Sequence, residues 1–60
     1  MNKYKIITQS KDNKKLTLEL LNNIDLLNVQ QEFIKKNYYI VSTYFNDNKT
    51  YIIVYKWEKL

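Results

Sequence analysis

Residues 38–57 read YYIVSTYFNDNKTYIIVYKW, two runs of aromatic and β-branched residues joined by a short polar segment. Residues of these types favour β-strands, and Asp and Asn tolerate the left-handed backbone that a two-residue hairpin loop requires. The stretch therefore predicts a β-hairpin with Asp47-Asn48 at its tip. In this register Phe45 lies opposite Thr50, and Ser42 lies opposite Ile53.

The tripeptide Asp-Asn-Lys at this tip occurs a second time, at residues 12–14. Residues 4–9 before it are rich in aromatic and β-branched types, and residues 16–20 after it alternate apolar and polar. We interpret Asp12-Asn13 as the tip of a matching first hairpin, an alignment that superposes Leu18 on Ile53. Both copies lack the spaced carboxylates and the glycine of an EF-hand loop, so we interpret them as turns and not as calcium sites.

Between the two hairpins the apolar spacing changes to that of a helix. Leu26, Val29 and Phe33 fall on one side of a helix over residues 25–37, and polar residues fall on the other. Asp25 is suited to cap its N-terminus. The pattern predicts an α+β fold of the order ββαββ, with one helix packed on a four-stranded sheet, in a single small domain over residues 1–60.

An alternative is the order βαββ, with one long helix over residues 15–36. Leu16, Leu20 and Ile24 fit the spacing of such a helix. Asn22 and Asn23 disfavour it, because asparagine is a poor helix former.

Both faces of the predicted sheet are apolar, whereas the solvated face of an antiparallel sheet normally carries polar residues. We expect the helix to cover the more apolar face, with Ile7, Leu16, Leu18, Leu20, Tyr38, Ile40, Ser42, Tyr44, Tyr51, Ile53, Tyr55 and Trp57. The second face would remain exposed, and exposed apolar patches mark interfaces. The candidate interface residues on that face are Tyr4, Ile6, Tyr39, Val41, Thr43, Phe45, Ile52, Val54 and Lys56.

The small size of the chain favours self-association. A domain of this length buries only about 60% of the surface of its unfolded chain. The sequence contains no Cys for a disulfide, and no Cys or His for a zinc site. We therefore expect a homodimer or higher oligomer that stacks the second faces of its sheets.

The residue types argue against catalysis. The chain has no His, Cys or Arg, its two serines, Ser10 and Ser42, have no local base, and its six carboxylates are scattered along the sequence. We expect a non-enzymatic binding protein without a cofactor or a metal.

The composition also bears on origin. Gly, Ala, Arg and Pro, which GC-rich codons encode, are absent, and Lys, Asn, Ile, Tyr and Phe supply 33 of the 60 residues. This bias indicates an AT-rich genome, and we expect a phage or mobile-element protein that acts stoichiometrically on a host or defence protein. No apolar run reaches the roughly 18 residues of a membrane span, and no signal-peptide core is present, so the expected location is the cytoplasm.

Nucleic-acid or nucleotide binding is the alternative function. Ten Lys against six acidic residues give a net charge of +4, although codon bias accounts for part of this excess. Lysines interleaved with aromatic residues supply phosphate contacts and stacking surfaces, while the missing Arg weakens the case. The candidate contacts are Lys5, Tyr55, Lys56, Trp57 and Lys59.

Overall fold

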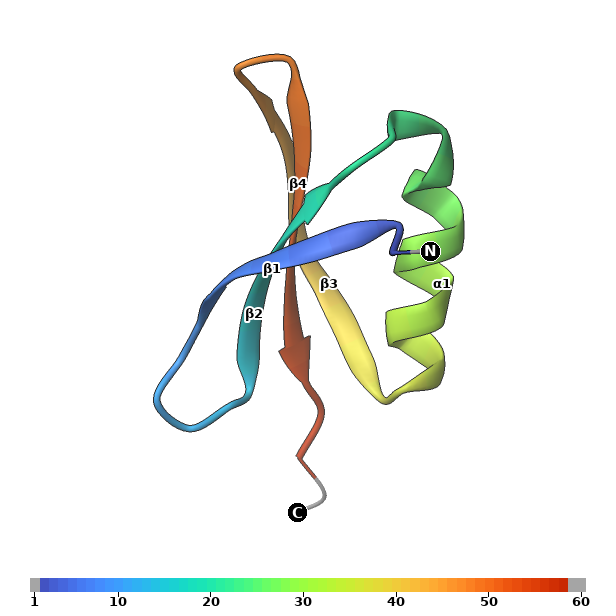
Figure 1. The fold of residues 1–60 in the computed structure, drawn as a ribbon. Helices are drawn as coiled ribbons and strands as arrows, with labels where there is room; N and C mark the ends of the chain where they lie inside the picture. The colour runs from blue at the N-terminus through green and yellow to red at the C-terminus, as the bar shows by residue number, and fades with distance from the viewer. Residues whose placement is uncertain (1, 59–60) are drawn as a thin grey trace.

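The computed structural model describes residues 2–58, which form a single four-stranded sheet with one helix on one of its faces (Figure 1). The elements are, in chain order, β1 (Tyr4–Gln9), β2 (Lys15–Leu20), a 3-10 turn η1 (Asn23–Asp25), α1 (Leu26–Lys35), β3 (Tyr38–Asn46) and β4 (Lys49–Lys56). This order confirms ββαββ. The long-helix alternative is wrong, because residues 15–20 form a strand.

The strands are antiparallel throughout and lie in the order β1-β2-β4-β3. The two hairpins therefore meet along β2 and β4 at the centre of the sheet, and β1 and β3 form its edges. The tips of the hairpins lie at opposite ends of the sheet (Figure 1).

The tip of the β3–β4 hairpin has the predicted geometry. Asn46 pairs with Lys49, which leaves Asp47 and Asn48 as the loop, with φ angles of 51° and 62°. Positive φ at both loop residues is the requirement of the hairpin turn whose twist matches that of the strands. In the absence of glycine, Asp and Asn meet this requirement at low cost.

The first hairpin has a different tip, so the prediction of two matching tips is wrong there. The Ser10 amide donates to the Lys15 carbonyl at 2.9 Å, which encloses a longer loop over residues 11–14. Within this loop Asn13 alone has a positive φ, of 60°. The Asp12 carboxylate instead accepts hydrogen bonds from the Ser10 hydroxyl and the Lys14 amide, and these bonds lower the pKa of Asp12.

The ends of the helical segment are set by asparagines. The Asn22 side chain accepts a hydrogen bond from the Ile24 amide at 3.2 Å and so starts the 3-10 turn. Asp25 occupies the N-cap position of α1, but its side chain makes no capping hydrogen bond, contrary to our expectation. At the other end Asn37 adopts a φ of 75° and donates to the Ile34 carbonyl at 3.1 Å, which ends the helix.

Each edge strand contains one β-bulge, at Ile7 in β1 and at Val41 in β3. Between each tip and its bulge the register is the predicted one. An extra residue transfers the side chains beyond it to the other face of the sheet. Ile40 and Ser42, which share a face in a regular strand, consequently lie on opposite faces.

The helix covers the expected side of β2, with Leu16, Leu18 and Leu20, but the unexpected side of β4, with Ile52 and Val54. The core beneath α1 consists of aliphatic side chains of β2 and β4 packed against Val29 and Phe33 of the helix: Leu16, Leu18, Leu20, Ile52 and Val54. The repeat alignment made Leu18 and Ile53 equivalent positions of the two hairpins, but the central strands pair Leu18 with Ile52, so Ile52 and not Ile53 shares the side of Leu18. Ile52 and Val54 are fully buried, so assigning them to an exposed face is wrong.

We expect Ile52→Val to lower the free energy of unfolding by about 0.5–1.5 kcal/mol, because it removes a methylene group from a fully buried site. The matched control Ile24→Val changes a side chain that is 83% exposed and should stay within about 0.5 kcal/mol of wild type. Urea unfolding followed by circular dichroism measures both. Equal losses in the two variants would contradict this core.

Candidate binding face

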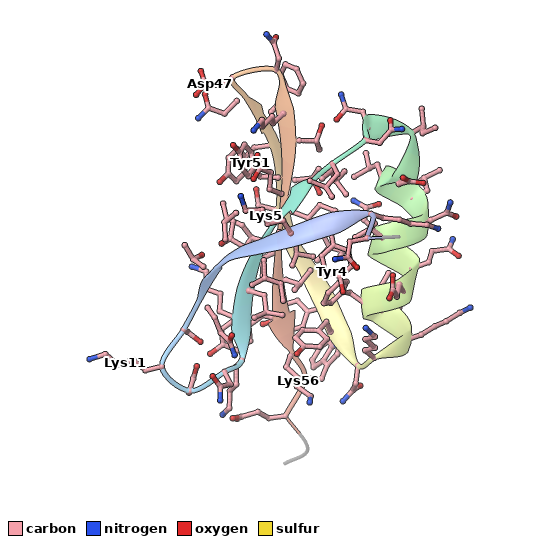
Figure 2. The ribbon with its side chains drawn as sticks, in the orientation of Figure 1. Tyr4, Lys5, Lys11, Asp47, Tyr51 and Lys56 are labelled. Carbon is pink, nitrogen blue, oxygen red and sulfur yellow. The ribbon has the colours of Figure 1, made fainter. Side chains whose placement is uncertain are left out.

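The face of the sheet that α1 leaves uncovered carries a group of aromatic side chains. Strand alternation places residues 51, 53 and 55 of β4 opposite the buried Ile52 and Val54, and Figure 2 shows Tyr51 on the side of the sheet away from the helix. Tyr39 and Tyr44 of β3 join this side, because each pairs with a tyrosine of β4. We term this surface the aromatic face, with members Tyr39, Tyr44, Tyr51, Ile53, Tyr55 and Trp57.

The rings of the aromatic face pack on one another across the two strands. Tyr44 and Tyr51 stack with their centroids 5.1 Å apart and their planes 17° apart. Tyr39 lies between Tyr55 and Trp57, with centroid distances of 5.9 Å and 4.7 Å. Cross-strand aromatic pairs stabilise a sheet and restrict the rotamers of their members. The surface is thus ordered before any partner binds.

The chain that follows β4 is held in place, which fixes Trp57. The Trp57 amide donates to the Asn37 carbonyl at 2.9 Å, and the Lys56 amide donates to the Lys14 carbonyl at 2.8 Å. The Glu58 carboxylate also forms an ion pair with the ammonium group of Lys14. Trp57 is therefore exposed on a supported backbone rather than on a free tail.

Charged side chains from the first hairpin flank the aromatic rings. Lys15 lies opposite Tyr55, and Glu19 lies between Lys5 and Tyr51 in the sheet. The Glu19 carboxylate accepts from Lys49 Nζ at 2.7 Å, and the side chain of Glu19 is only 10% exposed. Because Lys49 compensates Glu19, the two remaining lysines give this side of the aromatic face a positive charge.

The ion pair shifts the pKa of both partners. The hydrogen bond from Lys49 lowers the pKa of Glu19 below its ordinary value, with desolvation acting in the opposite direction. The same hydrogen bond raises the pKa of Lys49. Both pKa shifts favour the charged forms of Glu19 and Lys49. Their ion pair links the end of β4 next to the Asp47-Asn48 loop to β2.

The structure separates the predicted interface residues. Tyr39 lies on the aromatic face, whereas Ile52 and Val54 lie in the core. Tyr4 is half-buried between sheet and helix, with its ring 5.1 Å from that of Phe33 (Figure 2). The remaining members are exposed on the helix side or at the edge strands: Ile6, Val41, Thr43, Phe45 and Lys56.

The predicted nucleic-acid contacts are also divided. Tyr55 and Trp57 belong to the aromatic face, and Lys5 lies on the same side of the sheet, opposite Glu19. Lys56 lies on the helix side, where its ammonium is 5.7 Å from the centroid of the Tyr38 ring. Lys59 lies outside the described residues.

Sequence reasoning missed Tyr44 and Tyr51 as surface residues. It counted tyrosine as apolar and placed both under the helix. The available signal was chemical: a Tyr hydroxyl requires a hydrogen-bonding partner when buried, whereas Leu, Ile and Val do not. A face rich in tyrosine is therefore better suited to contact with water than one of purely aliphatic side chains.

A hollow lies between the helix and β1, with a volume of about 750 Å³. Its lining combines apolar and charged side chains: Asn2, Lys3, Tyr4, Lys5, Ile6, Leu21 and Glu32. Across residues 2–58, no three His, Cys, Asp or Glu side chains gather in a way that would hold a metal ion. Within the same residues, α1 falls short of the length and apolar character of a membrane-crossing helix.

Comparison of the chain with protein-family models, with curated proteins and with solved structures finds no match.

We expect Lys49→Met to raise the pKa of Glu19, because it removes the hydrogen bond that stabilises the carboxylate. Because the pKa of Glu19 is lower in the folded state than in the unfolded chain, the ion pair stabilises the protein at pH values above the ordinary glutamate pKa of about 4.3. This stabilisation is lost as the pH falls through the lowered pKa of the folded state. The stability difference between wild type and Lys49→Met should therefore be largest near neutral pH and shrink in acid. NMR titration of the Glu19 carboxyl and urea unfolding at several pH values measure the two effects.

The matched control is Lys15→Met, because Lys15 lies on the same side of the sheet as Lys49 and makes no ion pair with Glu19. It should leave the pKa of Glu19 lowered. If both variants shift Glu19 equally, general surface charge and not the ion pair sets its pKa.

Proposed function

We propose that this protein is a non-enzymatic binding protein that acts stoichiometrically on a partner protein through its aromatic face. The observation that supports this proposal is the cluster of tyrosines and Trp57 on the sheet face that the helix leaves uncovered. A few residues carry most of the binding energy in protein interfaces, and tyrosine and tryptophan are enriched among them. Their mutual packing lowers the entropy that they lose on binding.

The charge of this face favours a partner with an acidic surface. Lys5 and Lys15 flank the rings, and Glu19 is neutralised by Lys49. The net charge of the whole chain, +4, has the same sign. Complementary charge accelerates encounter and selects among partners, while the aromatic residues supply affinity.

The composition supports a source for such a partner. A chain with the residue bias of an AT-rich genome fits a phage or mobile element, and the partner would then be a host or defence protein in the cytoplasm of the host cell. A small protein without a reactive cluster would act there by occupying a surface.

Binding of single-stranded nucleic acid is a second candidate, and one observation favours it. Lys5, Tyr55 and Trp57 lie on the same face, which is the combination that holds phosphates and stacks bases. The packing of the rings on one another works against it, since Tyr44 and Tyr51 each use one ring plane for their own stack. We therefore favour a protein partner.

We expect Trp57→Ser and Tyr44→Ser each to weaken binding of the partner by about 30-fold or more, the effect of losing an interface hot spot. Ile24→Ser, an exposed change on the helical segment, should leave the affinity unchanged. The partner is first captured from nuclease-treated lysate of a low-GC bacterium and identified by mass spectrometry. Its purified form is then titrated calorimetrically with wild type and the three variants.

Two results would overturn the proposal. Equal affinities of Trp57→Ser and Ile24→Ser would show that the aromatic face is not the contact surface. The nucleic-acid function would be established instead by two observations together. The partner would no longer be captured after nuclease treatment, and a single-stranded oligonucleotide would bind wild type in a salt-sensitive manner but would not bind Trp57→Ser.

A further inference from the structure

The outer edge of β3 is unpaired in the part of the chain that the structure describes, and it lacks the usual protection of an edge strand. All nine residues of β3, Tyr38–Asn46, are uncharged. The opposite edge, β1, has six residues and contains Lys5. Natural sheets blunt their edges with lysine, proline, short strands or bulges. β3 has only the bulge at Val41, which leaves residues 42–46 regular.

Apolar side chains of the helix stand over this same edge. Gln30 Nε2 donates to Thr43 Oγ1 of β3 at 3.1 Å, which identifies the flank of α1 that faces β3. Leu27 and Ile34 lie on that flank, about one turn to either side of Gln30, and both are exposed. The other flank, with Glu32, faces β1 across the hollow described above.

We propose that this edge pairs with a second copy of the chain. Thr43 of β3 lies opposite Thr43 of the second copy at a two-fold axis, so residue 42 faces residue 44 and residue 41 faces residue 45 in antiparallel fashion, which unites two four-stranded sheets into one continuous sheet. A strand that pairs with itself about a two-fold axis is necessarily antiparallel and self-complementary. The pairing gives hydrogen-bond partners to the backbone N–H and C=O groups at the β3 edge of both copies.

Electrostatic repulsion opposes self-pairing at the β1 edge but not at the β3 edge. Each chain carries a net charge of +4, so two copies repel each other at most surfaces. Like charges placed opposite each other in a sheet are destabilising, and β1 would bring Lys5 toward its counterpart. The uncharged β3 edge brings no charges together.

The helices would also meet at this axis. Neighbouring strands lie about 4.8 Å apart, and α1 packs mainly over β3 and β4, so the two helices would lie about 10 Å apart. This is the spacing of packed helices. Gln30 lies midway between Leu27 and Ile34, and the axis reverses the helix direction, so Leu27 of one copy would meet Ile34 of the other.

The paired sheet differs from the stacked oligomer that the sequence predicted, because the aromatic faces stay free. Tyr44 lies beside the proposed axis, so the two aromatic faces would join into one continuous surface. Dimerisation at the edge stands independently of the proposed function. It would double the surface available to a partner.

Sedimentation equilibrium at micromolar concentration tests the pairing. We expect wild type to sediment at twice the 7.4 kDa chain mass. Val41→Lys places a charge at the paired edge and should raise the dimer dissociation constant at least 10-fold. Ile7→Lys is the matched control, because both residues are apolar bulge positions on edge strands, with exposed fractions of 52% for Val41 and 39% for Ile7. It should dimerise as wild type does.

A wild-type monomer at these concentrations, an undiminished dimer of Val41→Lys, or dissociation by Ile7→Lys alone would each overturn the proposal. A mixture of isotope-labelled and unlabelled chains tests the geometry independently of any variant. Nuclear Overhauser contacts between Leu27 and Ile34 of different copies would support edge pairing. Intermolecular contacts of Ile53 in place of these would show that the aromatic faces stack instead.

Discussion

A ten-residue helix covers one face of a sheet, and the choice of that face determines every surface of this protein. Val29 and Phe33 pack onto the leucines of β2 and onto Ile52 and Val54 of β4. These aliphatic side chains lose no hydrogen bonds on burial, whereas buried tyrosines would need partners for their hydroxyls. Once the helix occupies the aliphatic face, the tyrosines of β4 and Tyr39 and Tyr44 of β3 are left on the other.

Sequence patterns predicted the elements and the side of β2 that the helix covers, but they placed the helix on the wrong side of β4. Strand alternation, the change of period near Asp25 and the Asp-Asn turn were sufficient for the ββαββ order and for the register near each tip. The bulges at Ile7 and Val41 have no compositional signal, since neither is a glycine. A single extra residue exchanges the faces beyond it, so Ile40 lies on the helix side of the sheet although Ser42 lies on the other side.

A separate error, in the side of β4 that was placed under the helix, affected the candidate site. Alternation shows that residues 51, 53 and 55 of β4 share one side and that Ile52 and Val54 share the other, but it does not show which side the helix covers. Counting tyrosine with the apolar residues removed the contrast between these two sides of β4. The pairing of Leu18 with Ile52 across the central strands resolves the question, and this contact joins residues that are distant in the sequence.

Two surfaces of the described chain have different physical characters. The aromatic face combines prepacked rings with lysines, which suits a partner of opposite charge. The β3 edge is uncharged and is flanked by the exposed Leu27 and Ile34, which suits a second copy. A chain that buries few residues gains stability from such pairing, because oligomerisation is one of the ways in which small domains supplement a limited core.

The central claim is that α1 packs on the aliphatic face and leaves the aromatic face open. Nuclear Overhauser spectroscopy on the purified protein tests it most directly. The account predicts contacts from Val29 and Phe33 of the helix to the methyl groups of Ile52 and Val54, with none to Ile53. Contacts from these helix residues to Ile53 or to the ring of Tyr51 would place the helix on the other face and contradict the account.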